Sequence, residues 1–118
     1  MIVKIAWALI GLLHLVPGFV FLRPEMLSSL YGVETTGNAG MIAVHRAAWF
    51  LSISAGCLWA ILDPSVRRVI SVFVGVSIVS FLIAYARAGL PAGEMRGVAI
   101  ADTVALLPLG VILWSAWR

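Results

Sequence analysis

Charged residues are scarce in this sequence, and their scarcity excludes an ordinary water-soluble domain. Only 11% of the 118 residues are charged, whereas 63% are hydrophobic and the mean hydropathy is +1.11. An ordinary soluble domain is about 25% charged and about 45–50% apolar. A soluble protein of this length exposes a large fraction of its surface and has no means of hiding so many apolar side chains. The composition predicts one integral membrane domain, residues 1–118, with the lipid bilayer as its partner.

The sequence has one cysteine and no recognisable catalytic motif. The single cysteine, Cys57, lies inside an apolar run, so no intrachain disulfide forms, and we expect its thiol to be a small buried apolar group. The sequence has no Gly-x-Ser-x-Gly elbow, phosphate loop, Cys-x-x-Cys or His-Glu-x-x-His motif. The absence of these motifs leaves open both which cofactor, if any, the protein binds and whether it is an enzyme.

A stripe of basic residues is also missing, although the net charge is +3. The basic residues are scattered singly or in the one pair Arg67-Arg68, unlike the footprint of a nucleic-acid-binding protein. We therefore exclude nucleic acid as a partner. In a membrane protein such charges instead set the topology and contact lipid headgroups.

Four apolar segments are long enough to cross a membrane. A helix rises about 1.5 Å per residue, so roughly 20 apolar residues cross a hydrocarbon core of about 30 Å. The segments lie at about residues 2–22, 41–62, 69–86 and 97–117. Proline-containing breaks follow the first three of them. The pattern predicts an all-α fold, an up-down-up-down transmembrane four-helix bundle.

The connections between these segments add detail to the predicted bundle. Asp63-Pro64 combines a helix-capping residue with a proline at the first helical position, so the second and third spans are antiparallel neighbours. Residues 24–32 form a short amphipathic helix, ended by Gly32, that we expect to lie in the membrane interface between the first two spans. We expect Asn38 to cap the second span.

The distribution of charge and tryptophan predicts the orientation. The basic residues expected on the side of the two termini are Lys4, Arg67, Arg68 and Arg118. The tryptophans expected near that side, as an interfacial belt, are Trp7, Trp59, Trp114 and Trp117. The other side has Arg23, Arg87 and Arg96, with Arg46 just inside its span, so a small excess of basic residues on the terminal side predicts, by the positive-inside rule, that both termini are cytoplasmic.

Five ionisable side chains lie within or at the ends of the spans, where a charge at the bilayer centre costs about 2.5–3.5 kcal/mol. They are His14, His45, Arg46, Arg87 and Asp102. The helix lengths place all five in the half of the bilayer away from the termini. Ionisable groups retained in a membrane usually face the interior of a bundle and find partners there. We therefore expect these five to meet.

Helical spacing predicts which residues share a packing face with these side chains. The predicted stripes are Trp7, Gly11, His14 and Gly18; His45, Trp49, Ser52, Gly56 and Trp59; Ser77, Ser80, Ala84 and Arg87; and Val98, Asp102, Ala105 and Leu109. Small and weakly polar residues at such spacing permit close helix packing in lipid. The pattern indicates that the polar groups occupy packing faces.

Two interpretations of the polar set compete. In the structural one, Asp102 pairs with Arg46 or Arg96, and each histidine bonds a backbone carbonyl or a serine, so that the network only fixes helix register. A metal site is a weaker third interpretation, because two histidines and a carboxylate can form a facial triad. These histidines lie on different helices, however, and no paired-ligand motif supports a metal.

In the functional interpretation, the five residues surround a cavity open to water or lipid. His14 or His45 shuttles a proton or binds a ligand head, Asp102 orients it, and Arg46 or Arg87 holds an anion. Pro17 follows His14, and a proline kink widens the space beside that histidine.

Three short motifs carry a resemblance to a known family. They are the Leu22-Arg23-Pro24 break, the Leu-x-x-Leu-Tyr-Gly turn at residues 27–32, and the helix opening at residues 45–56. The chain resembles the small DoxX-like four-helix membrane proteins, and especially an uncharacterised bacterial branch of them. That branch often has an acidic residue where this chain has His45. Named members of the group are linked to quinone-associated electron transfer. The resemblance implies a bacterial inner-membrane location.

The leading functional prediction is a small membrane protein whose polar pocket binds or processes a lipophilic molecule such as a quinone, isoprenoid or lipid. The alternative is a non-catalytic accessory or assembly subunit of a larger membrane complex. A proton-coupled exporter ranks below both, because it needs a continuous polar path and the terminal half of the bundle offers little beyond serines. A homodimer is compatible with the glycine and serine stripes.

Overall fold

The structure, a computed structural model, describes all of residues 1–118, and it is entirely helical. Helices make up 85% of the chain, and no strand is present. The elements in chain order are α1 (Ile2–Gly18), η1 (Phe19–Phe21), α2 (Met26–Tyr31), α3 (Gly37–Leu62), η2 (Pro64–Val66), α4 (Arg67–Arg87) and α5 (Glu94–Trp117). The predicted all-α class is confirmed.

Four of the helical segments are long and apolar enough to cross a membrane. They are Ile2–Phe21, Gly37–Leu62, Pro64–Arg87 and Glu94–Trp117, of 20 to 26 residues. The four spans predicted from hydropathy are therefore confirmed in number, length and composition. The last three begin three to five residues earlier than predicted, because a helix continues through polar residues at its first turn that a hydropathy pattern leaves out.

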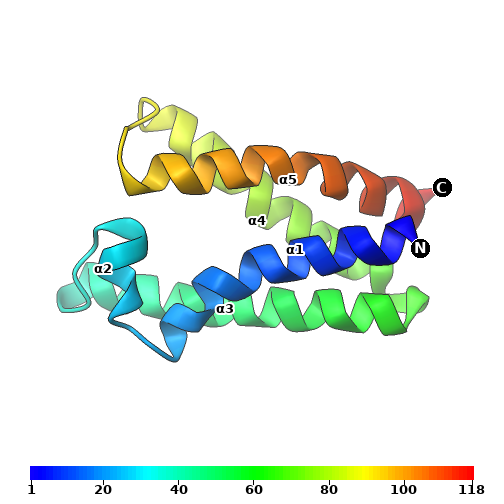
Figure 1. The fold of residues 1–118 in the computed structure, drawn as a ribbon, viewed down its shortest axis with the longest axis horizontal. Helices are drawn as coiled ribbons and strands as arrows, with labels where there is room; N and C mark the ends of the chain where they lie inside the picture. Colours follow the sequence, from blue (N-terminus) through cyan, green and yellow to red (C-terminus); the bar gives the residue numbers. More distant parts are fainter.

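The four long helices lie side by side along the longest dimension of the molecule, which measures 43 Å. Successive long helices run in opposite directions in Figure 1, and both chain ends lie at one end of the molecule. Helix α1 packs against both α3 and α5, while α4 packs against α5 and more lightly against α3. The short helix α2 lies at the end away from the termini, against α3 and α5.

The main core fills the bundle toward the chain ends. It includes Trp7, Ile10, Cys57, Ile78 and Ile112, which are all completely buried. Cys57 is thus the buried apolar group that the sequence predicts. The sequence predicted that Trp7 belongs to an interfacial belt. This prediction is wrong, because its ring is completely buried in this core. Its indole N–H has no hydrogen-bond partner.

Small residues bring α1 close to α3, as the predicted stripe on α1 requires. Trp7, Gly11, His14 and Gly18 are all buried. A Cβ atom added at Gly18 would lie 2.8 Å from the Leu51 side chain of α3. The Ser54 hydroxyl of α3 donates a hydrogen bond of 2.9 Å to the Gly11 carbonyl. Glycine therefore permits the backbone approach through which two membrane helices gain contact.

The predicted packing stripe on α3 is wrong except for Gly56, which is buried. Trp49 and Trp59 are 62% and 56% exposed, and His45 and Ser52 are exposed as well. The buried residues of α3 are Gly40, Ala47, Gly56, Cys57 and Ala60. This face consists only of small side chains, so α1 and α4 can approach it closely. The large indole rings of the predicted face would hold those helices apart, and they lie on the outside instead.

The packing stripe predicted for α4 is mostly wrong, and the one predicted for α5 is confirmed. On α4, Ser77 is half-buried, but Ser80, Ala84 and Arg87 are exposed, and the buried residues of the helix are Ser71, Val74 and Ile78. On α5, Ala105 and Leu109 are buried while Val98 and Asp102 are half-buried, so the predicted stripe is confirmed there.

Turn residues account for the connections. The Asp63 carboxylate accepts a hydrogen bond of 2.8 Å from the Ser65 backbone N–H, and Pro64 begins the next turn, as predicted. Gly32 ends α2 in the left-handed conformation with φ 65°, also as predicted. Asn38 does not cap α3. The helix begins one residue earlier, at Gly37, so the asparagine lies inside its first turn.

Candidate functional site

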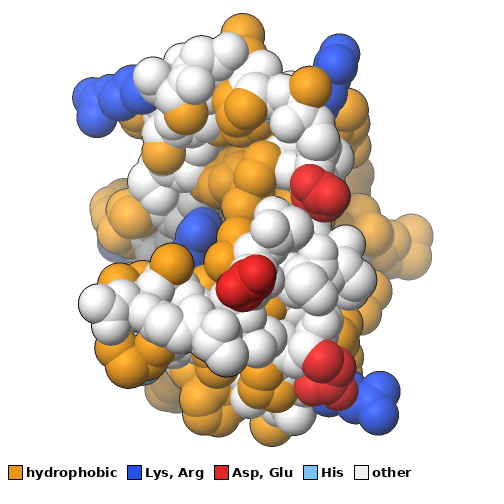
Figure 2. All heavy atoms as spheres, turned by 90° about the vertical axis from the view of Figure 1, so that its left-hand side faces the viewer, with side chains coloured by type: hydrophobic (Ala, Val, Ile, Leu, Met, Phe, Trp, Pro, Cys, Tyr) orange, Lys and Arg blue, Asp and Glu red, His pale blue; other side chains and the backbone are white.

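A cavity of about 430 Å³ lies at the end of the bundle away from the termini. All five α-helices contribute to its lining, which is mainly hydrophobic. Figure 2 looks directly onto this end of the molecule. Hydrophobic side chains occupy the centre of that face, between two lobes of polar side chains and backbone, and charged side chains stand around them.

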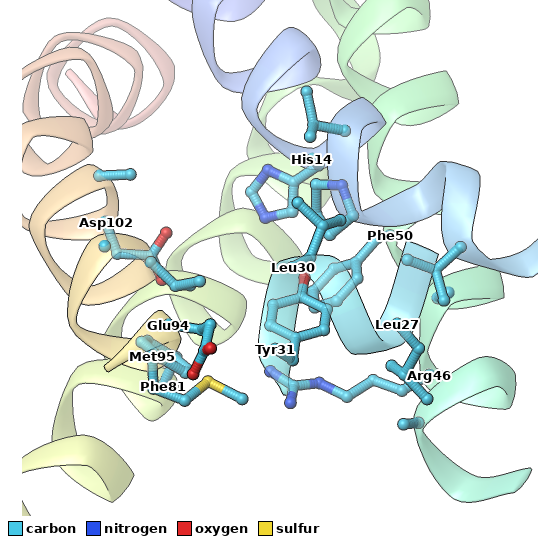
Figure 3. A pocket seen from close by; sticks show the side chains of 18 of the residues that line it. His14, Leu27, Leu30, Tyr31, Arg46, Phe50, Phe81, Glu94, Met95 and Asp102 are labelled. Atoms are coloured by element: carbon cyan, nitrogen blue, oxygen red, sulfur yellow. The ribbon is translucent and has the colours of Figure 1, made fainter. Parts of the chain in front are cut away.

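Polar side chains enter this cavity from five different helices. They are His14 of α1, Tyr31 of α2, Arg46 of α3, Ser77 of α4, and Glu94 and Asp102 of α5. Figure 3 shows His14, Tyr31, Arg46 and Asp102 directed toward one central space. The fold therefore assembles groups that lie far apart in the sequence.

His14 is the most deeply placed of these groups, at 4% exposure. Its Nδ1 atom lies 2.9 Å from the Ile10 carbonyl, and its Nε2 atom lies 3.0 Å from the Ser77 hydroxyl. A carbonyl only accepts, so Nδ1 carries the proton, and in the neutral imidazole Nε2 accepts from the serine. The structural interpretation of the sequence expected each histidine to bond a backbone carbonyl or a serine, and His14 bonds one of each. Both ring nitrogens are occupied within the protein.

Arg46 approaches the cavity from the opposite side. Its guanidinium lies over the ring of Phe50, 5.0 Å from the ring centre, a cation–π arrangement. It makes no hydrogen bond and no ion pair within the protein. Its five N–H donors therefore remain available to an anionic group in or near the cavity.

Asp102 does not form the predicted ion pair with Arg46 or Arg96. The only ion pair in the structure joins Arg23 to Glu25, which are both exposed. The reason lies in the arrangement of the helices, because α3 and α5 face each other across the cavity while α1 packs between them. The half-buried carboxylate of Asp102 consequently has no charged partner within 4.0 Å.

Tyr31 was missed by the reasoning from the sequence. It follows Leu27 by one helical turn, and Leu27 is buried against Val20 and Ala47, so α2 directs both side chains inward. Burial raises the pKa of the Tyr31 phenol; the Arg46 cation opposes this rise, and the Asp102 carboxylate adds to it. Tyr31 thus lies within electrostatic reach of both charges. The i, i+4 spacing to Leu27 was the signal that could have revealed it.

The remaining two predicted site residues lie elsewhere. His45 and Arg87 are exposed, and neither lines the cavity. His45 is adjacent to Arg46 in the sequence, and successive residues of a helix point in directions about 100° apart. Arg87 is the last residue of α4. The facial triad of His14, His45 and Asp102 does not assemble, and no group of three or more His, Cys, Asp or Glu side chains is placed to hold a metal ion.

No family model matches this chain, and no curated protein or solved structure matches it either. The resemblance to DoxX-like proteins therefore stays a prediction. The chemistry of the cavity can be stated from its own residues. It offers an apolar chamber with one cation, two carboxylates, a phenol and a histidine–serine pair at its walls.

Proposed function

We propose that this chain is a multi-pass membrane protein whose end cavity binds a lipophilic small molecule, in the class of quinones, isoprenoids or lipids, by a polar head. One observation carries the proposal. Tyr31, Arg46 and Asp102 project into a mainly apolar cavity, and none of the three has a hydrogen-bond or ion-pair partner in the protein. Arg46 is exposed, and Tyr31 and Asp102 are half-buried, so a ligand that enters the cavity can replace water at all three groups and bond them directly.

The outer surface of the helices supports a location in lipid. Large apolar side chains along every long helix are exposed; examples are Leu12, Trp49, Val76 and Leu107. Contact with water would cost about 25 cal/mol for each Å² of this apolar surface, whereas contact with lipid acyl chains removes that cost. We propose that the four spans cross the bilayer in an up-down-up-down order, with α2 in the interface over the cavity.

The distribution of charge supports an orientation. Near the ends of the spans, four basic residues lie at the end that holds the termini (Lys4, Arg67, Arg68 and Arg118) and three lie at the cavity end (Arg23, Arg87 and Arg96), where Arg46 lies inside a span. Basic residues are retained on the cytoplasmic side of membranes. We propose that both termini are cytoplasmic, in a bacterial inner membrane as the DoxX-like resemblance implies, and that the cavity opens on the other side.

The size and lining of the cavity support a small organic ligand. Its volume of about 430 Å³ falls in the range of about 300–1,000 Å³ that is usual for such ligands. Apolar side chains such as Val16, Val20 and Phe50 line most of it, and a few polar groups converge on one region. That combination suits a molecule with an apolar body and a polar head.

Mass spectrometry of the gently purified protein, native and after organic extraction, tests this proposal. We expect a stoichiometric small molecule in the wild type and in Arg87→Gln, which alters an exposed arginine outside the cavity. We expect its loss from the folded double variant Arg46→Gln/Asp102→Asn, which removes two charges of the cavity with little change in shape. A second protein retained in place of a small molecule, in all three forms, would identify an accessory subunit of a larger complex and refute the proposal.

A further inference from the structure

The charges in the cavity specify the head group of its ligand, an inference that rests on the proposed function. We propose that the ligand is an amphiphile whose head carries both an anionic group and a primary ammonium group, as a phosphoethanolamine head does. Arg46 binds the anionic group, and Asp102 binds the ammonium. The apolar walls receive the adjoining part of the hydrophobic body.

The first observation is that opposite charges stand on opposite walls. Figure 3 shows Arg46 entering from the side of α3, with its guanidinium beside the Tyr31 ring, and Asp102 and Glu94 on the side of α5. Arg46 belongs to α3, whereas both carboxylates belong to α5. No ion pair within 4.0 Å connects the two walls.

The second observation is that the two charges line the same cavity at different depths. Arg46 is exposed, whereas Asp102 is half-buried. Helix α3 also begins farther toward the cavity end than α5 does (Figure 1). A single head group that extends along the cavity can therefore contact both, while Glu94, at the start of α5, adds negative charge nearer the opening.

The third observation is that neither charge has a charged or hydrogen-bonded partner in the protein. Arg46 is exposed and stacks on the face of Phe50, and Asp102 accepts no hydrogen bond. The Tyr31 hydroxyl also has no partner in the protein, lies within electrostatic reach of both charges, and can donate to an anionic oxygen or accept from an ammonium. A ligand that brings opposite charges to these groups gains more beside apolar walls than it would in bulk water.

These observations discriminate among head groups. A neutral quinone or isoprenoid head neutralises neither the Arg46 charge nor the Asp102 charge. A head with a single charge neutralises one of them and leaves the other without a partner. A head that carries both charges a few bonds apart compensates both at once through charge-assisted hydrogen bonds. Arginine suits a phosphate because its planar donors match two phosphate oxygens.

Competition among lipids with identical acyl chains tests the head group. The full-length protein, depleted of lipid in mild detergent, is offered phosphatidylethanolamine, phosphatidylglycerol and diacylglycerol, and bound lipid is counted by native mass spectrometry. We expect phosphatidylethanolamine to be retained about tenfold over phosphatidylglycerol, which loses the one charge-assisted bond of the ammonium, and about a hundredfold over diacylglycerol, which loses both bonds. Equal retention of the three, or a preference for a quinol offered alongside, would overturn the inference and leave the proposed function intact. Stoichiometric binding of none of them would refute the proposed function itself.

Two variants assign the charges to the two walls. Asp102→Asn should remove the preference over phosphatidylglycerol, because that lipid lacks the ammonium. Arg46→Gln should reduce the preference over diacylglycerol about tenfold without removing it, because the phosphate loses its partner while Asp102 still binds the ammonium that diacylglycerol also lacks. Arg87→Gln is the matched control and should behave as the wild type, and elution as a single folded species qualifies each variant. Preferences unchanged in both cavity variants would overturn the assignment.

A soluble head group separates a lipid ligand from a water-soluble one. Glycerophosphoethanolamine has the same two charges without acyl chains. We expect it to displace phosphatidylethanolamine only in large excess, because the apolar walls contribute to binding. Displacement at equal concentration would overturn the amphiphile assignment.

Discussion

At the scale of single residues, His14 illustrates how a polar side chain is accommodated inside an apolar helix. Its two ring nitrogens bond the Ile10 carbonyl and the Ser77 hydroxyl, and its ring lies against Phe50. The bond to Ser77 is the only side-chain hydrogen bond that joins α1 to α4. It fixes the relative position of two helices at the base of the cavity.

Removal of this serine should destabilise the protein more than removal of its neighbour. Ser77→Ala leaves the buried Nε2 atom of His14 without a partner, so we expect a loss of about 0.5–2 kcal/mol in the free energy of unfolding. Ser80→Ala is the matched control, since its hydroxyl bonds only a carbonyl of its own helix. Thermal unfolding in detergent measures both. Equal effects of the two substitutions would show that the His14 bond adds nothing to stability.

Asp63 makes stability depend on pH. Hydrogen bonds from the Ser65 hydroxyl and backbone N–H hold the pKa of this carboxyl below its ordinary value of 3.8. The ionised form therefore stabilises the fold above pH 3.8, and this contribution is lost as the pH falls through the lower pKa of the folded state. We expect the melting temperature of the wild type to fall more steeply between pH 5 and pH 3 than that of Asp63→Asn. Parallel curves would contradict this.

At the scale of elements, the short helix α2 and the start of α3 determine how the cavity is closed. Leu27 of α2 packs against Val20 and Ala47, and Gly32 reverses the chain so that it can enter α3. Gly40, in the first turn of α3, lies against the backbone of Glu34 and Thr35. A side chain at that position has no space, so the loop can lie flat on the helix only because a glycine stands there.

Replacing glycine by alanine at two helical positions should therefore change the stability of the protein in opposite directions. Gly40→Ala places a methyl group where the backbone of Thr35 lies, and we expect it to displace the loop and α2 and to lower stability. Gly75→Ala, in α4, meets nothing within 4 Å and should be neutral or stabilising by up to about 1 kcal/mol. Melting temperatures and the bound lipid of the proposed site provide the comparison. A neutral Gly40→Ala would mean that the loop does not pack as described.

At the scale of the whole molecule, apolar content and charge are arranged along one axis. The apolar core fills the end near the termini, and the cavity fills the other. The net positive charge belongs to the terminal end, where Arg67 and Arg68 bond the carbonyls that end α3 and α5. In the orientation proposed above, this end faces the anionic cytoplasmic leaflet.

Cysteine labelling tests that direction. Cys57 is fully buried, so Cys57→Ala provides a background without reactive thiols. In intact spheroplasts, we expect a membrane-impermeant maleimide to label Thr36→Cys at the cavity end. Ser65→Cys, at the other end, should react only after the membrane is permeabilised. The reverse pattern would invert the orientation, and labelling of both in intact cells would contradict the proposed crossing.

The four spans, their breaks, the Asp63 cap, the Gly32 terminus and the burial of Cys57 follow from the sequence, because each depends on a local property. Hydropathy and turn chemistry act residue by residue against the surrounding solvent. The sequence also identified His14, Arg46 and Asp102. It placed His45 and Arg87 with them because a stripe of suitable spacing exists on more than one face of a helix.

Tertiary structure alone decided which faces pack and which polar groups meet. Helix α3 buries its face of small residues because the backbones of α1 and α4 approach it closely there, and this turns Trp49 and His45 outward. Arg46 and Asp102 stay apart because α1 packs against both α3 and α5 and separates them. Tyr31 lies within electrostatic reach of both because α2 packs against α3 and α5 at the cavity end. Spacing along one helix lists the possible faces, but the fit between helix backbones selects one of them.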